Sequence, residues 1–382
     1  MIEVPSDTSA LGLYVHFPWC IKKCPYCDFN SHPLKASTDQ EVYLDALLRD
    51  WHQQYESFGK ARIAQTHGGQ IASIFFGGGT PSLFKPQHLA RLLEEVPHQG
   101  AEITLEVNPG TAEYHRFEDY KDAGINRLSI GAQSFSNAQL ARLGRVHQQE
   151  ETVSAMAKAR QAGFSNINLD IMWGLPGQSV AQALEDLRQA IELQPQHMSW
   201  YQLTIEPKTE FAGRPPILPV DRVLQEIEQA GLALLAEAGF QRYEVSAFAR
   251  PGYACQHNLM YWSFGDYMGI GAGAHGKITQ GRNIYRTQRP SQPRLYQQGS
   301  QITELTAIPQ TQRPIEFMMN ALRLLDGVTQ QSFAERTQLP WQTVSQVWQE
   351  LVDLDLVRHD RCATTGLGLR YLDSVLERFL DA

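Results

Sequence analysis

Short β-rich runs alternate with amphipathic helical stretches from Leu11 to about residue 210, and few folds satisfy that order. Strict alternation of strand and helix implies right-handed βαβ crossovers and a parallel sheet. Six runs have strand character, at 11–17, 71–78, 102–107, 126–135, 167–175 and 198–205. The chain is therefore expected to be an α/β protein.

Polar residues at the ends of these strands help to choose between two α/β architectures. Six repeats are fewer than the eight of a closed (β/α) barrel, so an open partial barrel and a doubly wound sheet both remain possible. Cys20, the segment Gly77–Thr80, Glu106, Gln133 and Asp170 all fall at or just beyond C-terminal strand ends. A parallel barrel gathers such ends around one mouth, which favours a partial (β/α)6 barrel of the TIM type.

Changes of pattern along the chain predict three regions. The barrel is expected at 1–210, a region that completes it at 211–308, and a mostly helical, winged-helix-like domain at 309–382. Such a domain suggests DNA recognition, but residues 310–382 hold seven Lys and Arg against ten Asp and Glu, a balance of −3. Because a DNA-binding module needs a basic face, a structural or partner-docking role is favoured and no nucleic-acid partner is expected.

Composition places the chain in the cytoplasm. The formal net charge is −8, and the N-terminal segment "MIEVPSDTSA" lacks the pattern of a secretory signal. No apolar run approaches the roughly 18–20 residues that span a bilayer, so at most peripheral membrane contact is expected. Thiols stay reduced in that compartment, where clustered cysteines indicate metal binding or catalysis. Cys255 and Cys362 lie far from the other three cysteines and are expected to be packed, inert thiols.

Three of the five cysteines, Cys20, Cys24 and Cys27, form a C-x3-C-x2-C cluster. Thiolates select zinc, copper(I) or iron–sulfur clusters. A zinc site would need a fourth ligand, for which His16 and His32 are the nearby candidates. An iron–sulfur cube held by three cysteines instead keeps one iron free of protein ligands, and that open position suits an exchangeable small molecule.

The cluster, with Tyr26 between its second and third cysteines, resembles the signature of the radical S-adenosylmethionine (SAM) superfamily. The segment "FFGGGTPS" at 75–82 is similar to the glycine-rich segment of that superfamily. Its glycines would let the backbone approach the methionine amino group. The resemblance implies a [4Fe-4S] cluster whose open iron chelates the amino and carboxylate groups of SAM.

Narrower motifs resemble the oxygen-independent coproporphyrinogen oxidases and their sister group, the HemW-type haem chaperones. These motifs are "YVHFPWC", "EVNPG", "RLSIGAQSF", "LGRVH" and "NLDIMWGLPGQ", and the resemblance covers nearly the whole chain. Carboxylates can accept hydrogen bonds from ribose hydroxyls or the ammonium group, and an arginine can pair with the carboxylate. The positions implied to contact SAM are Tyr14, Gly78, Gly79, Thr80, Glu106, Gln133, Arg145 and Asp170; taken singly, each is also compatible with an ordinary polar strand end.

Two departures distinguish the chain from the oxidases. The oxidases resemble C-x3-C-x2-C-x-C, and Phe29 stands here at the position of their fourth cysteine. Only 19 residues precede the first cysteine, whereas the oxidases carry an N-terminal extension. The segment "HNLMYW", in an apparently loop-rich region, matches the HNxxYW motif of the haem chaperones. Imidazole is a common axial ligand of haem iron, and flat aromatic rings suit a macrocycle. The implied haem-binding residues are His257, Asn258, Tyr261 and Trp262.

The resemblance therefore implies a haem chaperone that carries a SAM-liganded cluster and passes haem to apoproteins, which include candidates from the respiratory chain. Expected partners are haem, the acceptor proteins, an electron donor such as a flavodoxin or ferredoxin, and a second copy in a homodimer. The alternative is an enzyme, an oxygen-independent coproporphyrinogen III oxidase that decarboxylates propionates through a SAM-derived radical. The balance leans away from an enzyme.

Overall fold

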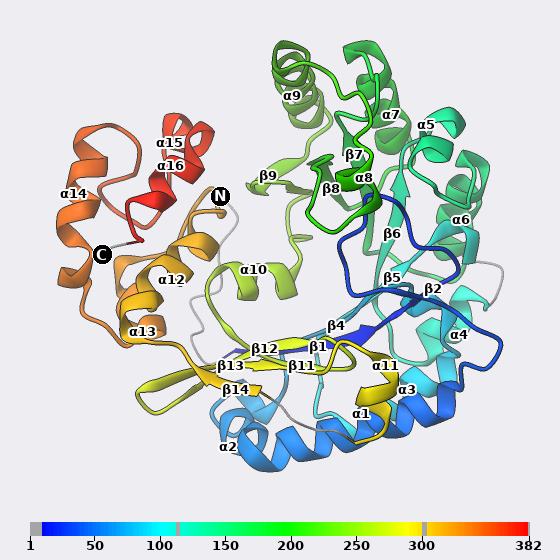
Figure 1. The fold of residues 1–382 in the computed structure, drawn as a ribbon, viewed down its shortest axis with the longest axis horizontal. Coiled ribbons are helices and arrows are strands. Elements are labelled where there is room, and N and C mark those ends of the chain that lie inside the picture. The colour runs from blue at the N-terminus through cyan, green and yellow to red at the C-terminus, as the bar shows by residue number, and fades with distance from the viewer. Residues whose placement is uncertain (1–9, 112–114, 300–303, 381–382) are drawn as a thin grey trace.

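The computed structural model describes residues 10–111, 115–299 and 304–380. The absence of a secretory signal was predicted from residues 1–10, and most of that segment lies outside the described residues. Within them, the chain forms a curved sheet with helices on its outer face and a largely helical C-terminal region (Figure 1). The expected α/β class is confirmed.

Six parallel strands form the centre of the sheet and follow one another in chain order. Their side chains are buried on both faces, as expected of parallel strands covered by helices. The strands are β1 (Leu11–Phe17), β4 (Ser73–Gly78), β5 (Glu102–Val107), β6 (Arg127–Gln133), β7 (Ile167–Trp173) and β8 (His197–Gln202). The helices that connect or follow them include α1 (Gln40–Gln54), α2 (Lys60–Ile63), α3 (Pro86–Glu95), α4 (Phe117–Asp122), α5 (Asn137–Arg142), α6 (Gln149–Gln161), α7 (Val180–Glu192), α8 (Glu210–Gly213) and α9 (Asp221–Glu237).

Later segments extend both edges of this parallel sheet. On one side β11 (Asp266–Ile270) pairs in parallel with β1, and β12 (His275–Gln280), β13 (Asn283–Gln288) and β14 (Glu304–Ala307) continue in antiparallel order. On the other side β10 (Ala247–Ala249) and β9 (Gln241–Glu244) add antiparallel strands to β8. The result is a twelve-stranded sheet that, within the described residues, runs from β14 to β9 without closing on itself. Helix α11 (Pro293–Gln297) lies between β13 and β14 in sequence.

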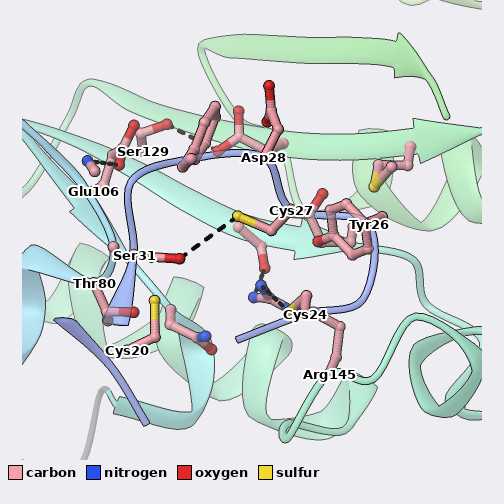
Figure 2. A pocket seen from close by; sticks show the side chains of 18 of the residues that line it. Cys20, Cys24, Tyr26, Cys27, Asp28, Ser31, Thr80, Glu106, Ser129 and Arg145 are labelled. Atoms are coloured by element: carbon pink, nitrogen blue, oxygen red, sulfur yellow. Dashed lines mark hydrogen bonds between the residues drawn. The ribbon is translucent and has the colours of Figure 1, made fainter. Parts of the chain in front are cut away.

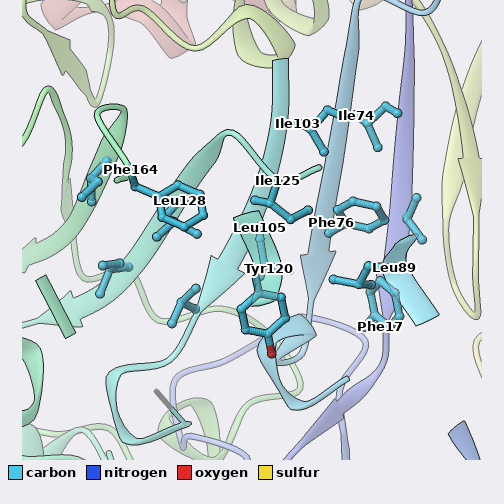
Figure 3. Packing of buried hydrophobic residues seen from close by; sticks show 14 of the residues in the cluster. Phe17, Ile74, Phe76, Leu89, Ile103, Leu105, Tyr120, Ile125, Leu128 and Phe164 are labelled. Carbon is cyan, nitrogen blue, oxygen red and sulfur yellow. The ribbon is translucent and has the colours of Figure 1, made fainter. Parts of the chain in front are cut away.

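Apolar side chains between the strands and the outer helices form the main core (Figure 3). Ile103 and Leu105 of β5 and Phe76 of β4 are at most 3% exposed. Leu89 on α3 and Tyr120 on α4 cover them from the outer layer, and both are also buried. At about 25 cal/mol per Å² of apolar surface removed from water, this continuous core holds the strand ends in fixed positions.

The "HNLMYW" segment was expected in a loop-rich region, and that prediction is wrong. Residues Gln256–Trp262 form helix α10, which packs against β1, β4 and β11. Figure 1 shows α10 on the concave side of the sheet. A Cβ built at Gly12 of β1 would lie 2.2 Å from the Met260 methyl carbon, so the helix lies very close to the strand. A helix this short is stable only through such tertiary contacts, and local sequence therefore predicts it poorly.

The C-terminal region forms a second core around Phe317, Phe333, Trp348 and Phe379. Its helices are α12 (Arg313–Ala321), α13 (Gln330–Thr337), α14 (Ser345–Asp353), α15 (Gly366–Arg370) and α16 (Leu372–Glu377). None of the helices in the described part of the chain is long and apolar enough to cross a bilayer.

Candidate functional site

A cavity of about 420 Å³ opens at the C-terminal ends of the parallel strands. It is lined by all three clustered cysteines and by seven of the eight residues predicted to contact SAM. Figure 2 shows the cysteines around one space, with Thr80 and Glu106 on one side and Arg145 on another. The exception is Tyr14, which lies outside the cavity lining and shares a 3.0 Å hydrogen bond with His16 Nδ1.

The cysteines lie on a loop whose two ends are tied together. Strand β2 (Trp19–Cys20) pairs with β3 (His32–Pro33), and the Cys27 N–H donates to the Cys24 carbonyl over 3.1 Å. The described residues contain no group of three or more His, Cys, Asp or Glu side chains placed to hold a single metal ion. The three thiols line one cavity from a single short loop, and thiolates are the ligands of iron–sulfur clusters.

The two histidines that might have completed a zinc site already have other partners. His16 Nε2 donates to the Asn30 carbonyl over 2.8 Å, while its Nδ1 faces the Tyr14 hydroxyl. His32 Nε2 lies 3.2 Å from Asn30 Oδ1 and 3.3 Å from the Ser291 carbonyl. Neither imidazole is among the residues that line the cavity. The zinc alternative therefore lacks its expected fourth ligand.

Burial makes the thiolate form costly at two of the cysteines. It raises the pKa of Cys20, which the Thr80 hydroxyl partly offsets, and it raises the pKa of Cys27. Thiolates are the metal-binding form of cysteine. Positive charge at this loop would therefore offset the cost of ionising both groups.

The glycine-rich segment forms hydrogen bonds with the backbone that leads into the cysteine loop. The Gly79 N–H donates to the Phe17 carbonyl over 2.7 Å, and the Thr80 N–H donates to the Trp19 carbonyl over 2.8 Å. A Cβ at Gly79 would lie 2.6 Å from the Trp19 carbonyl oxygen, too close for any other residue without movement. Gly78 has φ 114°, in the region that favours glycine. The glycines thus allow strand β4 to lie directly against the backbone that leads into Cys20.

Two half-buried carboxylates line the cavity opposite the cysteine loop. Burial raises the pKa of Glu106 to about 8, and the Asp170 charge adds to the shift, although the Gly78 N–H donates to Glu106 over 3.0 Å. Burial also raises the pKa of Asp170, against hydrogen bonds from Asn168 and Ser129. Both shifts indicate negative charge that lacks sufficient compensation. A ligand carrying a cation or several hydroxyl donors would supply that compensation.

Gln133 and Arg145 complete the lining. Gln133 adopts φ 65° at a register shift between β6 and β7, and its side-chain oxygen accepts a 2.7 Å hydrogen bond from the Tyr201 hydroxyl. A non-glycine residue with this φ costs roughly 1 kcal/mol and is frequent at functional sites. Arg145 donates to the Gly131 carbonyl over 2.9 Å and lies 3.9 Å from the Cys24 sulfur. Its buried Nε atom has no hydrogen-bond partner within the part of the chain that the structure describes.

The sequence analysis missed several lining residues. Ser129, Met172, Tyr201 and Thr204 also face the cavity. Tyr201 and Thr204 lie near the C-terminal end of the observed β8, but both fall inside the strand predicted at 198–205, so the strand-end rule did not select them. Ser129 and Met172 carry no comparable sequence signal, because their direction depends on the twist and register of β6 and β7.

The four residues predicted to bind haem lie together on α10, near the other end of the strands. His257 Nδ1 lies 2.9 Å from the hydroxyl of Ser73, the first residue of β4, whereas Gly78 at the cavity is the last. Burial lowers the pKa of His257 to about 3, so its ring is neutral, and it is 7% exposed. The side chains of Asn258, Tyr261 and Trp262 are half-buried. At roughly 3.3 Å per strand residue, about 16 Å of β4 separates α10 from the cavity.

Comparison with known proteins agrees with this fold. Residues 14–190 match the Radical SAM superfamily, and residues 308–362 match the HemN C-terminal domain. The three-cysteine cavity at the mouth of a parallel sheet is thus that of a radical SAM protein, a class that implies a [4Fe-4S] cluster and SAM.

Full-length relatives place the chain more narrowly. It is 46% identical over 389 residues to the Escherichia coli protein named "Heme chaperone HemW", covering 100% of both chains. It is also 46% identical to the Haemophilus influenzae protein of that name, covering 97% of this chain and 98% of the relative. A Bacillus subtilis relative, also named a heme chaperone, is 33% identical over 85% of this chain and 86% of its own length. The chain belongs to the HemW heme chaperone family.

One solved structure shares the whole fold. Coproporphyrinogen III oxidase (HemN) from Escherichia coli superposes with a TM-score of 0.78, covering 99% of this chain and 92% of the oxidase, at 24% identity. At that identity the likeness establishes the fold, which the two groups share, and leaves their activities to be decided on other grounds.

Proposed function

We propose that this protein binds haem and transfers it to acceptor proteins, with a [4Fe-4S] cluster and SAM bound at the mouth of its sheet. The observation that carries the proposal is the 46% identity, along the full length of both chains, to a protein named a heme chaperone. The position two residues after the third cysteine supports it, because Phe29 is 58% exposed and offers no fourth thiol.

The chemistry of the cavity supports the cluster assignment. Cys20, Cys24 and Cys27 would hold three irons, and the thiolates are the ligands such clusters require. When bound, the cluster would supply a fourth iron for chelation by SAM and a centre that takes up one electron. Arg145, with its Nη1 atom 3.9 Å from the Cys24 sulfur, places a positive charge beside the anionic thiolates. Burial lowers the pKa of a guanidinium, but Tyr26 and Cys24 raise the pKa of Arg145 above its usual value, so it remains charged.

The remaining lining residues support a SAM assignment. Glu106 and Asp170 offer acceptors for the ammonium group and the ribose hydroxyls, and their raised pKa values show that compensating donors are lacking. Gln133 is held by Tyr201 so that its amide nitrogen remains available. These groups bind and orient the nucleotide.

Helix α10 is the proposed haem site. A hydrogen bond from His257 Nδ1 to the Ser73 hydroxyl would fix the ring tautomer and leave the Nε2 lone pair for iron. Tyr261 and Trp262 pack edge to face with ring centroids 4.8 Å apart. Among the described residues the buried Trp262 Nε1 has no hydrogen-bond partner, and the Arg323 guanidinium lies 4.4 Å from the Trp262 ring. A flat, partly polar ligand would find aromatic surface and a cation there.

Haem titration followed by Soret absorbance tests this site. We expect His257→Ala to weaken haem binding at least tenfold, whereas His275→Ala should bind as wild type does, because His275 is an exposed histidine on β12 outside the motif. Cluster content and melting temperature are measured for both variants. Equal haem affinity in wild type and His257→Ala would remove this residue from the ligand set while leaving the cluster site unaffected.

The shared fold makes coproporphyrinogen III oxidation the second candidate. Anaerobically reconstituted protein is incubated with SAM, a reductant and coproporphyrinogen III, with an authentic oxidase as the positive control. We expect no protoporphyrinogen above background. Product formed at catalytic turnover would reject the chaperone proposal.

A further inference from the structure

A continuous chain of hydrogen bonds runs through the barrel interior from the nucleotide cavity to α10. Asn168 Nδ2 lies 2.8 Å from Asp170 Oδ1, and Asn168 Oδ1 lies 2.6 Å from His197 Nδ1. His197 Nε2 lies 2.8 Å from the Tyr243 hydroxyl, and the Cys255 N–H reaches that hydroxyl over 3.4 Å. Asn168, His197, Tyr243 and Cys255 are each at most 3% exposed. These four residues therefore have little direct contact with solvent.

The donors and acceptors can be assigned in only one consistent direction. The Asn168 amide donates to Asp170, so its oxygen must accept from His197 Nδ1–H. His197 Nε2 then accepts from the Tyr243 O–H, whose oxygen accepts from the Cys255 N–H. Burial lowers the pKa of His197 well below its usual value, which excludes the doubly protonated ring. Every bond thus points toward Asp170, and bonds aligned in this way polarise one another.

The end of this hydrogen-bond series that lies farthest from Asp170 holds the start of α10. Cys255 is the N-cap residue of this helix, and its side chain makes no capping hydrogen bond. The next free N–H group, that of Gln256, donates to Glu102 Oε1 over 2.9 Å. The first turn of α10 is therefore held by side chains that extend from the sheet, chiefly Tyr243 and Glu102.

We infer that Asn168, His197 and Tyr243 are positioning residues that couple the nucleotide cavity to α10, so that SAM bound at Asp170 favours the haem-binding form of the helix. This inference rests on the proposed function, because it links the two ligands assigned there. It goes beyond that function by giving SAM a regulatory role that requires no cleavage.

The sign of the coupling follows from ordering. A ligand that fixes the Asp170 carboxylate also fixes the orientation of the Asn168 amide and hence the His197 ring. Haem then binds to a helix whose first turn is already ordered. Haem binding therefore costs less conformational entropy. Coupling of this kind is reciprocal, so haem must tighten SAM binding by the same factor.

The experiment compares haem affinity with and without SAM, using cluster-containing protein and no reductant. For wild type we expect saturating SAM to lower the haem Kd at least fivefold. Tyr243→Phe keeps the ring and removes one hydroxyl. In this variant the ratio of the haem Kd without SAM to the haem Kd with SAM should fall below about twofold. Tyr296→Phe is the matched control, because that hydroxyl is also buried and hydrogen-bonded, to Asp50, the Gly271 N–H and the Ala46 carbonyl, none of which belongs to the series from Asp170 to Cys255. It should retain the wild-type ratio.

Hydrogen exchange of the amides in 253–265 gives a readout that does not depend on haem. We expect SAM to slow exchange there in wild type and Tyr296→Phe, but not in Tyr243→Phe. If SAM slows exchange although haem does not bind, the chaperone proposal fails and the coupling stands. Haem binding that ignores SAM in wild type overturns the coupling, as does an unchanged ratio in a folded, SAM-binding Tyr243→Phe.

Discussion

Replacement of Gly79 by alanine tests how closely the glycine-rich segment must lie against the cysteine loop. The new Cβ would lie 2.6 Å from the Trp19 carbonyl oxygen and 2.8 Å from the Trp19 backbone nitrogen, where ordinary contact begins at 3.4 Å. The backbone must therefore separate by about 0.8 Å (3.4 − 2.6), because both sides of the contact are main chain. Such overpacking costs about 1–3 kcal/mol. The displaced segment, Trp19–Cys20, carries the first cysteine of the cluster.

Urea denaturation of Gly79→Ala should show a free energy of unfolding about 1–3 kcal/mol below that of wild type. The reconstituted variant should bind less iron and should have a lower affinity for SAM. Gly213→Ala is the control, since no atom lies within 4 Å of its added Cβ, and it should stay within about 0.5 kcal/mol. Wild-type stability together with wild-type iron content in Gly79→Ala would refute the close-packing argument.

Three further predictions concern charge and metal. Because the folded pKa of Glu106 is raised to about 8 from 4.5, the folded state holds this proton more tightly, and stability of the cluster-free, nucleotide-free protein should fall as pH rises through that window. Glu106→Gln should flatten the fall in melts at several pH values. Lys277→Met removes a buried partner 2.7 Å from Asp266 and should cost about 3 kcal/mol in urea denaturation; a loss below about 1 kcal/mol would contradict it. Cys24→Ala should abolish iron uptake in anaerobic reconstitution, whereas Cys362→Ala, buried in the C-terminal core, should keep it.

The sequence predicted the cavity well because the relevant signals are local. A C-x3-C-x2-C spacing brings three thiols onto one short loop whatever the rest of the chain does. Parallel strands bring their C-terminal ends to one edge, so the position of Glu106, the penultimate residue of β5, followed from counting along its strand. Asp170 was also expected at a strand end, but it is the fourth of the seven residues of β7. Tyr14 was assigned by resemblance; its hydroxyl lies 3.0 Å from His16 Nδ1, outside the cavity lining, and its contact with SAM stays a prediction.

The sequence alone determined the α/β class, the cysteine loop and the place of Glu106 near the end of its strand, since each depends on residues close together in the chain or on a fixed periodicity. Only the tertiary structure decided that 256–262 forms a helix, that β11 pairs with β1, and that a hydrogen-bonded chain joins Asp170 to Cys255. The physical reason is distance along the chain. His257 and Ser73 are 184 residues apart, and a contact of that range is fixed by packing of the whole sheet, which no local pattern records.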